Sequence, residues 1–397
     1  MNPHRLKFFL LCLSFGLFAA NGAESSPRDF AQPAWGRIVP ATNATGQIRL
    51  EIRSWPADGK LALPTPFANL TSARLFVGRR IEPLKWVFNS DASMLHLELP
   101  LTVPATMPAT VLLETTENSA RFSDGRIVYS ALDAKVQGNS AKLETHPGNH
   151  RISFWTDLAD SVSWDYKPAR WGMYDVEIAF AAQGGGGTDL HFELAGKTFT
   201  VKRPSTDSWY RYQTLDIGRL YLSDAKPFTV RAGCKALMGA AVMNLKSITL
   251  RPAPEGSPIN QEASGAITLL ARDATTHSIT MRYEPAANKN CLGYWTNPND
   301  WAEWEFTVTR PGEFDVEVWQ GCGTGNGGSE VSIEVGGRQF GFVVEETGHF
   351  QSFVARRVGR AQFEKPGTYW LKVQPRRKQA AAVMDVSQVR LLPVNAP

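Results

Sequence analysis

The chain has 397 residues, of which 43% are hydrophobic and 20% are charged. This balance is that of a globular protein of two to three domains, and it excludes a disordered chain. The formal net charge of +4 does not indicate a nucleic-acid partner, because removal of an N-terminal leader takes Arg5 and Lys7 and leaves +2. The densest basic cluster, at 376–378, is short and typical of a solvated loop.

Residues 1–23 have the pattern of a secretory signal peptide. Arg5 and Lys7 precede an apolar run at 8–20, and small residues ending at Ala23 provide a cleavage site. The run is short for a membrane span, so we expect a secreted or periplasmic protein, with an uncleaved anchor as the alternative. We expect no membrane contact after cleavage.

Residues 33–119 predict a small β-sandwich of their own. Short runs rich in β-branched and aromatic residues alternate with Pro, Gly and Asn, which is typical of antiparallel strands joined by turns. The expected strands lie at 48–52, 72–77, 84–88, 94–99 and 110–114.

The rest of the chain consists of two similar segments in tandem. Residues 124–178 return at 264–318 with an offset of 140, and the offset is 141 beyond a glycine-rich loop. Each copy has the size of a domain rather than of a solenoid repeat. We therefore expect a first module at 122–252, a Pro- and Ser-rich linker at 253–263, and a second module at 264–393.

The modules alternate apolar and polar residues with the period of a strand. In the run WAEWEF the face predicted to be buried carries Ala302, Trp304 and Phe306, and the other face carries Trp301, Glu303 and Glu305. The same phase in the first module makes Trp164 the counterpart of Trp304. No stretch of either module has a helical period. The chain is therefore predicted to be all-β, with three β-sandwich domains.

Three cysteines, Cys234, Cys291 and Cys322, follow the leader. In an exported protein Cys291 and Cys322 of the second module can form a disulfide. The first module lacks both, so the shared fold cannot depend on this bridge. Three buried free thiols are the alternative.

The modules resemble the galactose-binding-like jelly rolls of carbohydrate-binding module families 6 and 35. The matching elements are an Asp-Ala pair at 133–134 and 273–274, NDWAEWEF at 299–306, PGEFDVEV at 311–318 and KPGTYWLKV at 365–373. The loops YWTNPNDW and QGCGTGNGGSEV are similar to accessory modules that follow the catalytic domains of secreted sulfatases and glycosidases. The resemblance implies two jelly rolls that bind glycans.

The N-terminal segment resembles the C-terminal β-sandwich of family 29 α-L-fucosidases, on residues 52–64, 73–78 and 99–114. In those enzymes a catalytic (β/α)8 barrel precedes the sandwich, and a barrel needs about 200 residues or more. The leader ends only shortly before residue 33, so we expect a non-catalytic protein. An α-L-fucosidase-related hydrolase or its accessory subunit is one alternative, and a structural protein–protein interaction module is the other.

The sequence offers little other chemistry. Glu303 and Glu305 share a strand face and could act as a hydrolytic pair, but a solvated acidic face is the more typical interpretation. The glycines at 323–328 match GxGxxG but open a strand instead of a helix, so no nucleotide site is expected.

We predict neither a metal nor a cofactor. The resembling families hold calcium with glutamates that flank the alanine of the first strand, whereas this chain has Ser130 and Leu132 there, and Leu270 and Arg272 in the second module. The seven histidines have no metal-ligand spacing. Asp385 is interpreted as a strand-end carboxylate.

The resemblance places sugar binding at loops that carry aromatic residues, because a pyranose stacks its C–H face on an exposed ring. The candidates of the first module are Phe154, Trp155, Asp157, Asp207, Trp209 and Tyr210. Those of the second module are Tyr294, Trp295, Asn297, Asn299, His349 and Phe350. Alternatively, Trp155 and Trp295 plug the ends of the sandwiches. The expected partner is a glycan or polysaccharide, such as a fucosylated or sulfated one, together with a separate glycosidase or sulfatase, and no nucleic acid.

Overall fold

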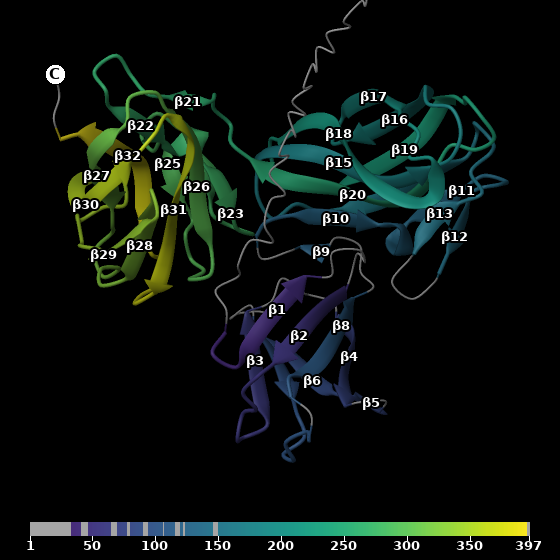
Figure 1. The fold of residues 1–397 in the computed structure, drawn as a ribbon, viewed down its shortest axis with the longest axis horizontal. Coiled ribbons are helices and arrows are strands. Elements are labelled where there is room, and N and C mark those ends of the chain that lie inside the picture. The colour runs from purple at the N-terminus through teal and green to yellow at the C-terminus, as the bar shows by residue number, and fades with distance from the viewer. Residues whose placement is uncertain are drawn as a thin grey trace, which may run out of the picture.

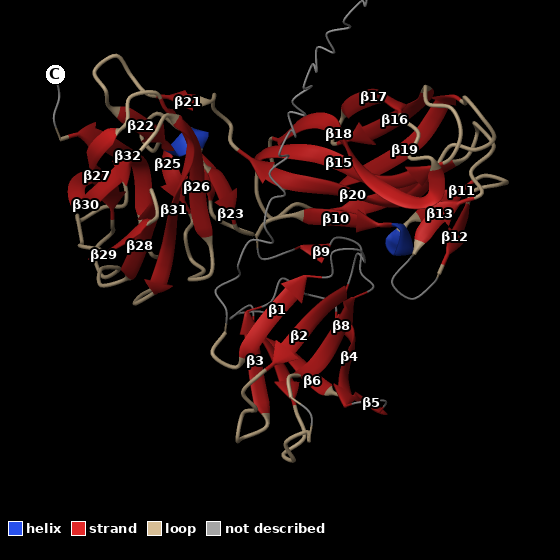
Figure 2. Ribbon diagram, viewed as in Figure 1, coloured by secondary structure: helices blue, strands red, loops and turns tan. Residues whose placement is uncertain are grey.

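The computed structural model describes residues 33–40, 47–64, 70–77, 80–89, 94–105, 107–115, 120–121, 124–145 and 150–394. Within these residues the chain is all-β, as predicted, and the helical elements are two 3-10 turns, η1 (Ala131–Asp133) and η2 (Ala271–Asp273) (Figure 2). No helix in this part of the chain is long and apolar enough to cross a membrane. The predicted signal peptide lies outside the described residues.

The N-terminal segment forms two antiparallel sheets around one core (Figure 1). Their strand orders are β1-β2-β8-β4-β5 and β3-β7-β6. The five predicted strands are confirmed as β2, β4, β6, β7 and β8. The bounds are β1 (Gly36–Pro40), β2 (Gln47–Ile52), β3 (Lys60–Pro64), β4 (Leu70–Val77), β5 (Arg80–Pro83), β6 (Lys85–Asn89), β7 (Met94–Glu98) and β8 (Ala109–Thr115).

The first module is a sandwich. One sheet has the order β12-β13-β20-β10-β9, with β15 pairing β20 and β18 pairing β15, and the other has the order β11-β14-β19-β16-β17. The bounds are β9 (Ala120–Arg121), β10 (Ile127–Ser130), β11 (Lys135–Gln137), β12 (Lys142–Glu144), β13 (Arg151–Ser153), β14 (Ser161–Tyr166), β15 (Gly172–Ala182), β16 (Thr188–Leu194), β17 (Lys197–Arg203), β18 (Ser208–Leu222), β19 (Phe228–Ala236) and β20 (Asn244–Ala253).

The second module repeats this arrangement. Its sheets have the orders β24-β25-β32-β27-β30, with β22 on β32, and β21-β26-β31-β28-β29, with β23 on β26. The bounds are β21 (Ile259–Asn260), β22 (Ile267–Leu270), β23 (Thr275–His277), β24 (Arg282–Glu284), β25 (Cys291–Gly293), β26 (Trp301–Val308), β27 (Gly312–Gly321), β28 (Glu330–Val335), β29 (Arg338–Val343), β30 (Val354–Phe363), β31 (Gly367–Arg377) and β32 (Asp385–Pro393).

The two cores are built around equivalent tryptophans. Trp164 and Trp304 are fully buried, which confirms the phase predicted from the alternation. The indole of Trp164 donates to the Ser130 carbonyl at 2.7 Å, and that of Trp304 donates to the Leu270 carbonyl at 2.8 Å. Each ring therefore fills its core and also satisfies the carbonyl that precedes the 3-10 turn.

Strand β10 belongs to two cores at once. Ile127 and Tyr129 face the core of the first module, while Val128 between them packs into the core of the N-terminal segment. Figure 1 shows β10 on the side of the first module that faces β1 and β2. This double burial explains why the strand has no polar face.

The cysteines are not bridged. Cys234, Cys291 and Cys322 are all buried and free. The disulfide considered between Cys291 and Cys322 is therefore not formed, and the alternative of three buried thiols applies.

Candidate functional site

The two tryptophans proposed for sugar binding, Trp155 and Trp295, are 0% exposed. The Trp155 carbonyl accepts a hydrogen bond from the Val242 amide at 2.7 Å, and the Trp295 carbonyl accepts one from the Val383 amide at 2.8 Å. Their indoles plug the loop end of each sandwich, as the alternative interpretation had it. Neither ring presents a face to a sugar in this structure.

The residues before these tryptophans point outward instead. Phe154 has φ of 55° and Tyr294 has φ of 59°, a left-handed backbone that few non-glycine residues adopt. The kink turns one aromatic ring out and the next ring in. Phe154 is 61% exposed and Tyr294 is 47% exposed. The kink recurs at the same place in both modules, which makes it a property of the shared fold.

Four side chains gather on the outer face of one sheet of the first module: Arg151 of β13, Tyr210 and Tyr212 of β18, and Lys246 of β20. We call them the Tyr210 surface. The Arg151 guanidinium lies 5.5 Å from the Tyr210 ring centroid, and the Lys246 ammonium lies 4.0 Å from that of Tyr212. Tyr210 is 70% exposed. Of these four residues the sequence analysis found Tyr210 alone, and the only signal for Tyr212 was its spacing of two along one strand.

The Tyr210 surface carries more positive than negative charge. Arg151 is buried and lies 2.8 Å from Glu144, which also accepts a hydrogen bond from the Ser153 hydroxyl at 2.6 Å. Burial, and then the positive charge of Arg151, lower the pKa of Lys246. Burial raises the pKa of Tyr212, and Arg151 opposes that shift. The Arg151 guanidinium and the Lys246 ammonium therefore lie close enough to repel each other, an arrangement that favours an added anion.

The other candidates of the first module have structural partners. Trp209 is half-buried against the core, and its carbonyl accepts a hydrogen bond from the Asn244 amide at 2.8 Å. The Asp157 carboxylate accepts one from the Ala159 backbone at 2.9 Å and so closes a turn. Asp207 is exposed with φ of 61°, in the turn before β18.

The second module lacks a Tyr210 surface. Cys291, Gln351, Phe353 and Ser387 stand where the first module has Arg151, Tyr210, Tyr212 and Lys246. The Gln351 amide donates to the Asp385 carboxylate at 2.8 Å, so it is held down on the sheet. No ring replaces that of Tyr210 at this position.

The remaining candidates of the second module lie in its loops. His349 is exposed, and its Nδ1 accepts a hydrogen bond from the Gln351 backbone at 3.2 Å. Phe350 is half-buried, with its ring so close to Gly323 that an added Cβ there would lie 2.7 Å from it. The Asn297 side chain accepts a hydrogen bond from the Asn299 backbone at 3.0 Å. These contacts shape the loops and leave only His349 fully accessible.

Tyr294 is drawn into the contact between the modules. The Arg282 guanidinium lies 3.5 Å from the Tyr294 ring centroid and 3.7 Å from that of Trp171, a residue of the first module. The Trp171 indole donates to the Tyr283 carbonyl at 3.0 Å. A cation between two rings is a favourable contact, and it occupies one face of the Tyr294 ring.

Arg170 anchors the same contact. It is buried, and its guanidinium donates to the Thr276 hydroxyl at 2.5 Å, to the Thr276 carbonyl at 3.1 Å and to the Met281 carbonyl. Gly125 approaches so closely that an added Cβ would lie 2.4 Å from the Ser278 carbonyl. The end of the first module thus covers β23 and the loop after it, as Figure 1 shows.

This contact changes the environment of an aspartate that both modules share. In the second module, burial raises the pKa of Asp300 to about 7, although a hydrogen bond from Ser278 acts against the shift. In the first module, burial acts to raise the pKa of Asp160, but hydrogen bonds from the side chain of Ser140 and from the amides of Ala141 and Asn139 lower it.

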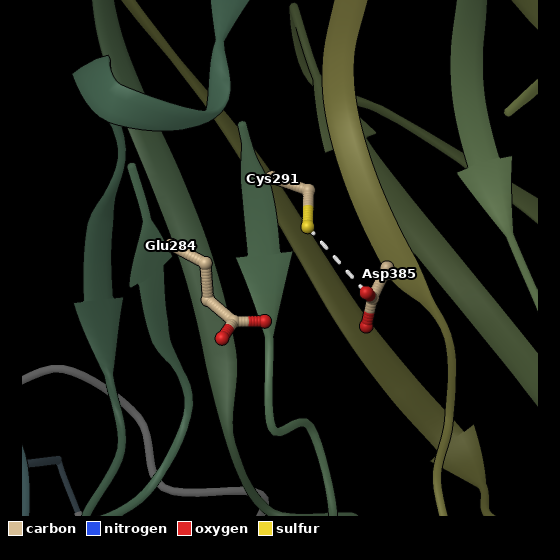
Figure 3. A group of neighbouring side chains, drawn as sticks. All are labelled: Glu284, Cys291 and Asp385. Atoms are coloured by element: carbon tan, nitrogen blue, oxygen red, sulfur yellow. Dashed lines mark hydrogen bonds between the residues drawn. The ribbon is translucent and has the colours of Figure 1, made fainter. Parts of the chain in front are cut away.

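Glu284, Cys291 and Asp385 form a buried cluster on the outer face of the β24-β25-β32 sheet (Figure 3). The thiol donates to the Asp385 carboxylate at 3.4 Å. Burial, and then the charge of Asp385, raise the pKa of Cys291, and burial raises the pKa of Asp385 to about 7. No sequence pattern predicted this cluster, because Asp385 lies 94 residues after Cys291 and even further from Glu284.

Glu303 and Glu305, which were considered as a hydrolytic pair, both lie on β26. The Glu303 carboxylate lies 3.0 Å from the His277 ring, which stacks on Trp301 at 4.6 Å. Glu305 is exposed on the same strand. The histidine gives Glu303 a structural partner on the sheet face.

Comparison with known proteins gives a family match and several similar structures. Residues 281–394 match a family described as a domain of unknown function, DUF5077, which covers most of the second module. No curated protein matches the chain. The β-(1,4)-mannanase GH26-CBM35 of Podospora anserina is 22% identical, with a TM-score of 0.28 over 35% of this chain, and the chain covers only 30% of its length.

Single modules match over nearly their whole length. A family 35 carbohydrate binding module from Clostridium thermocellum is 17% identical, with a TM-score of 0.28 over 32% of this chain and 96% of that one. The C-terminal CBM6 of the laminarinase LamC from Zobellia galactanivorans is 15% identical, with a TM-score of 0.27 over 32% and 98%. These two solved structures are modules of families 35 and 6. The similarity of the N-terminal segment to family 29 α-L-fucosidases stays a prediction.

Proposed function

We propose that this protein is an exported, non-catalytic glycan-binding protein, and that the Tyr210 surface of the first module is its binding site. One observation carries the proposal: Tyr210 is 70% exposed with its ring beside the Arg151 guanidinium, and the Lys246 ammonium lies over the ring of Tyr212 on the same sheet. An exposed ring accepts the apolar face of a pyranose, and fixed donors bind its hydroxyl groups.

The charge favours an acidic glycan. The positive charges of Arg151 and Lys246 repel each other. A carboxylate or sulfate on the sugar would relieve this repulsion and form charge-assisted hydrogen bonds. Uronate and sulfate groups share this chemistry, so the experiment below separates them.

The second module is proposed to support the first without binding in the same way. It has Gln351 in place of Tyr210, and the ring of Tyr294 in its loop is stacked against Arg282. In this view the protein acts beside a separate glycosidase or sulfatase on acidic polysaccharide, and the N-terminal β-sandwich serves as a spacer.

Affinity electrophoresis through gels that contain polysaccharide tests the proposal. We expect retardation in fucoidan or in pectin, which distinguishes sulfate from uronate, and little in neutral xylan. Tyr210→Ala should weaken binding by about 1–2 kcal/mol, roughly tenfold. Trp370→Ala, a change to a ring that is 50% exposed elsewhere, is the matched control and should bind normally. Absence of retardation on every polymer would overturn the proposal.

A further inference from the structure

The cluster of Glu284, Cys291 and Asp385 offers three ligand atoms to one point (Figure 3). One atom from each residue lies within 4.8 Å of the other two. Glu284 and Cys291 are paired across β24 and β25, and the neighbouring β25–β32 ladder joins Leu292 to Val386. Strands therefore fix all three side chains, which is what a preorganised site requires.

We infer that these three side chains bind a divalent cation of the zinc type. Zinc accepts thiolate sulfur together with carboxylate oxygen, whereas calcium and magnesium take oxygen ligands. Cys291 would bind as a thiolate and release its proton to solvent. Three protein ligands leave a fourth position for water.

The burial of the two carboxylates supports a cation. Glu284 and Asp385 are each 5% exposed. Glu284 Oε1 accepts a hydrogen bond from Lys289 at 2.7 Å, and Asp385 Oδ2 accepts from Cys291 and Gln351. Two carboxylates buried this close together repel each other when both are ionised, and a cation between them would offset that repulsion.

The first module fills the same place with a cation of its own. Arg151 stands at the position of Cys291, Asn244 at that of Asp385, and Glu144 at that of Glu284. The Arg151 guanidinium lies 2.8 Å from Glu144. Exchange of arginine for cysteine and of asparagine for aspartate makes the ionised cluster of the second module three charges more negative, and Lys289 returns only one of them. A divalent metal would restore the balance.

Cobalt binding tests this inference on the full chain after treatment with a chelator. We expect one equivalent of Co²⁺ with a thiolate-to-cobalt charge-transfer band, and a rise in Tm when Zn²⁺ is added, because a ligand of the folded state stabilises it. Cys291→Ser should abolish the band. The matched control Cys234→Ser removes another buried thiol and should retain it.

A second variant shows whether loss of the band in Cys291→Ser is due to loss of the ligand or to misfolding. Cys291→Arg combined with Asp385→Asn reproduces the pair of the first module, so it should fold, and it should bind no metal. The inference is overturned if the wild-type chain shows no charge-transfer band with equimolar cobalt, or if the band persists in Cys291→Ser.

Discussion

The two modules share a sequence, a strand order and a core tryptophan, yet their loop ends meet different surroundings. In the first module Phe154, the counterpart of Tyr294, is 61% exposed. In the second module the exposed ring of Tyr294 is stacked with Arg282 against Trp171 of its neighbour. Duplication preserved the fold, whereas docking of one copy on the other decided which loop end remained accessible.

Substitutions in the core that the two modules share should cause the largest loss of stability. Trp164→Ala and Trp304→Ala each remove a fully buried indole and its hydrogen bond, so each should reduce the free energy of unfolding by about 3–5 kcal/mol. Chemical denaturation followed by fluorescence measures both. Trp370→Ala should change stability by less than about 0.5 kcal/mol. A small effect in only one module would contradict the equivalence of the cores.

The two equivalent aspartates, Asp300 and Asp160, should contribute to stability with opposite dependence on pH. The pKa of Asp300 is raised to about 7 from an unfolded value of 3.8, so its contribution to stability declines as pH rises from about 4 to 7. Asp300→Asn should therefore stabilise the protein by about 1–4 kcal/mol at pH 8 and little at pH 4.

Asp160 provides the control for that experiment. Its pKa is lowered, so its stabilisation is present at neutral pH and is lost as pH falls through the folded-state pKa. Asp160→Asn should destabilise the protein at pH 7. Thermal unfolding of both variants across the pH range checks the pair, and equal signs for the two would contradict the difference between the modules.

The contact between the modules can be broken separately. Arg282→Ala removes the cation between Trp171 and Tyr294 and should weaken docking by about 2 kcal/mol. Calorimetry should then show two separated transitions where the wild type shows coupled unfolding. Arg219→Ala breaks an exposed ion pair with Asp175, at 2.7 Å, and should leave the coupling unchanged.

The smallest effect concerns the charge of the Tyr210 surface. Lys246→Ser introduces the residue of the second module and should weaken binding of acidic polysaccharide about two- to fivefold. Binding should also become less sensitive to salt. Affinity electrophoresis at two ionic strengths measures both. An equal loss on neutral and acidic polymers would show that Lys246 acts through packing instead of charge.

Alternation along the strands was sufficient to place many side chains. It identified Trp164 and Trp304 as core residues because a strand with one buried face has a strict period of two. It placed Trp301 on the opposite face, and yet Trp301 is only 5% exposed, because His277 of β23 stacks on it. The period of two tells on which face of the strand a residue lies, but not which residues cover that face.

Loop residues were harder to place from the sequence. Phe154 and Trp155 are adjacent and equally apolar, but a left-handed φ at Phe154 turns one outward and the other into the core. Backbone strain of this kind is maintained by the surrounding fold and has no local signature in a non-glycine residue.

The sequence by itself determined the all-β class, the duplication and the central core, because these depend on local alternation and on similarity between the copies. The tertiary structure decided which rings are open and which charges meet. Trp171 covers the ring of Tyr294, and Glu284, Cys291 and Asp385 converge, through contacts between residues far apart in the chain. Such contacts depend on strand pairing and on docking of whole modules, which no local pattern encodes.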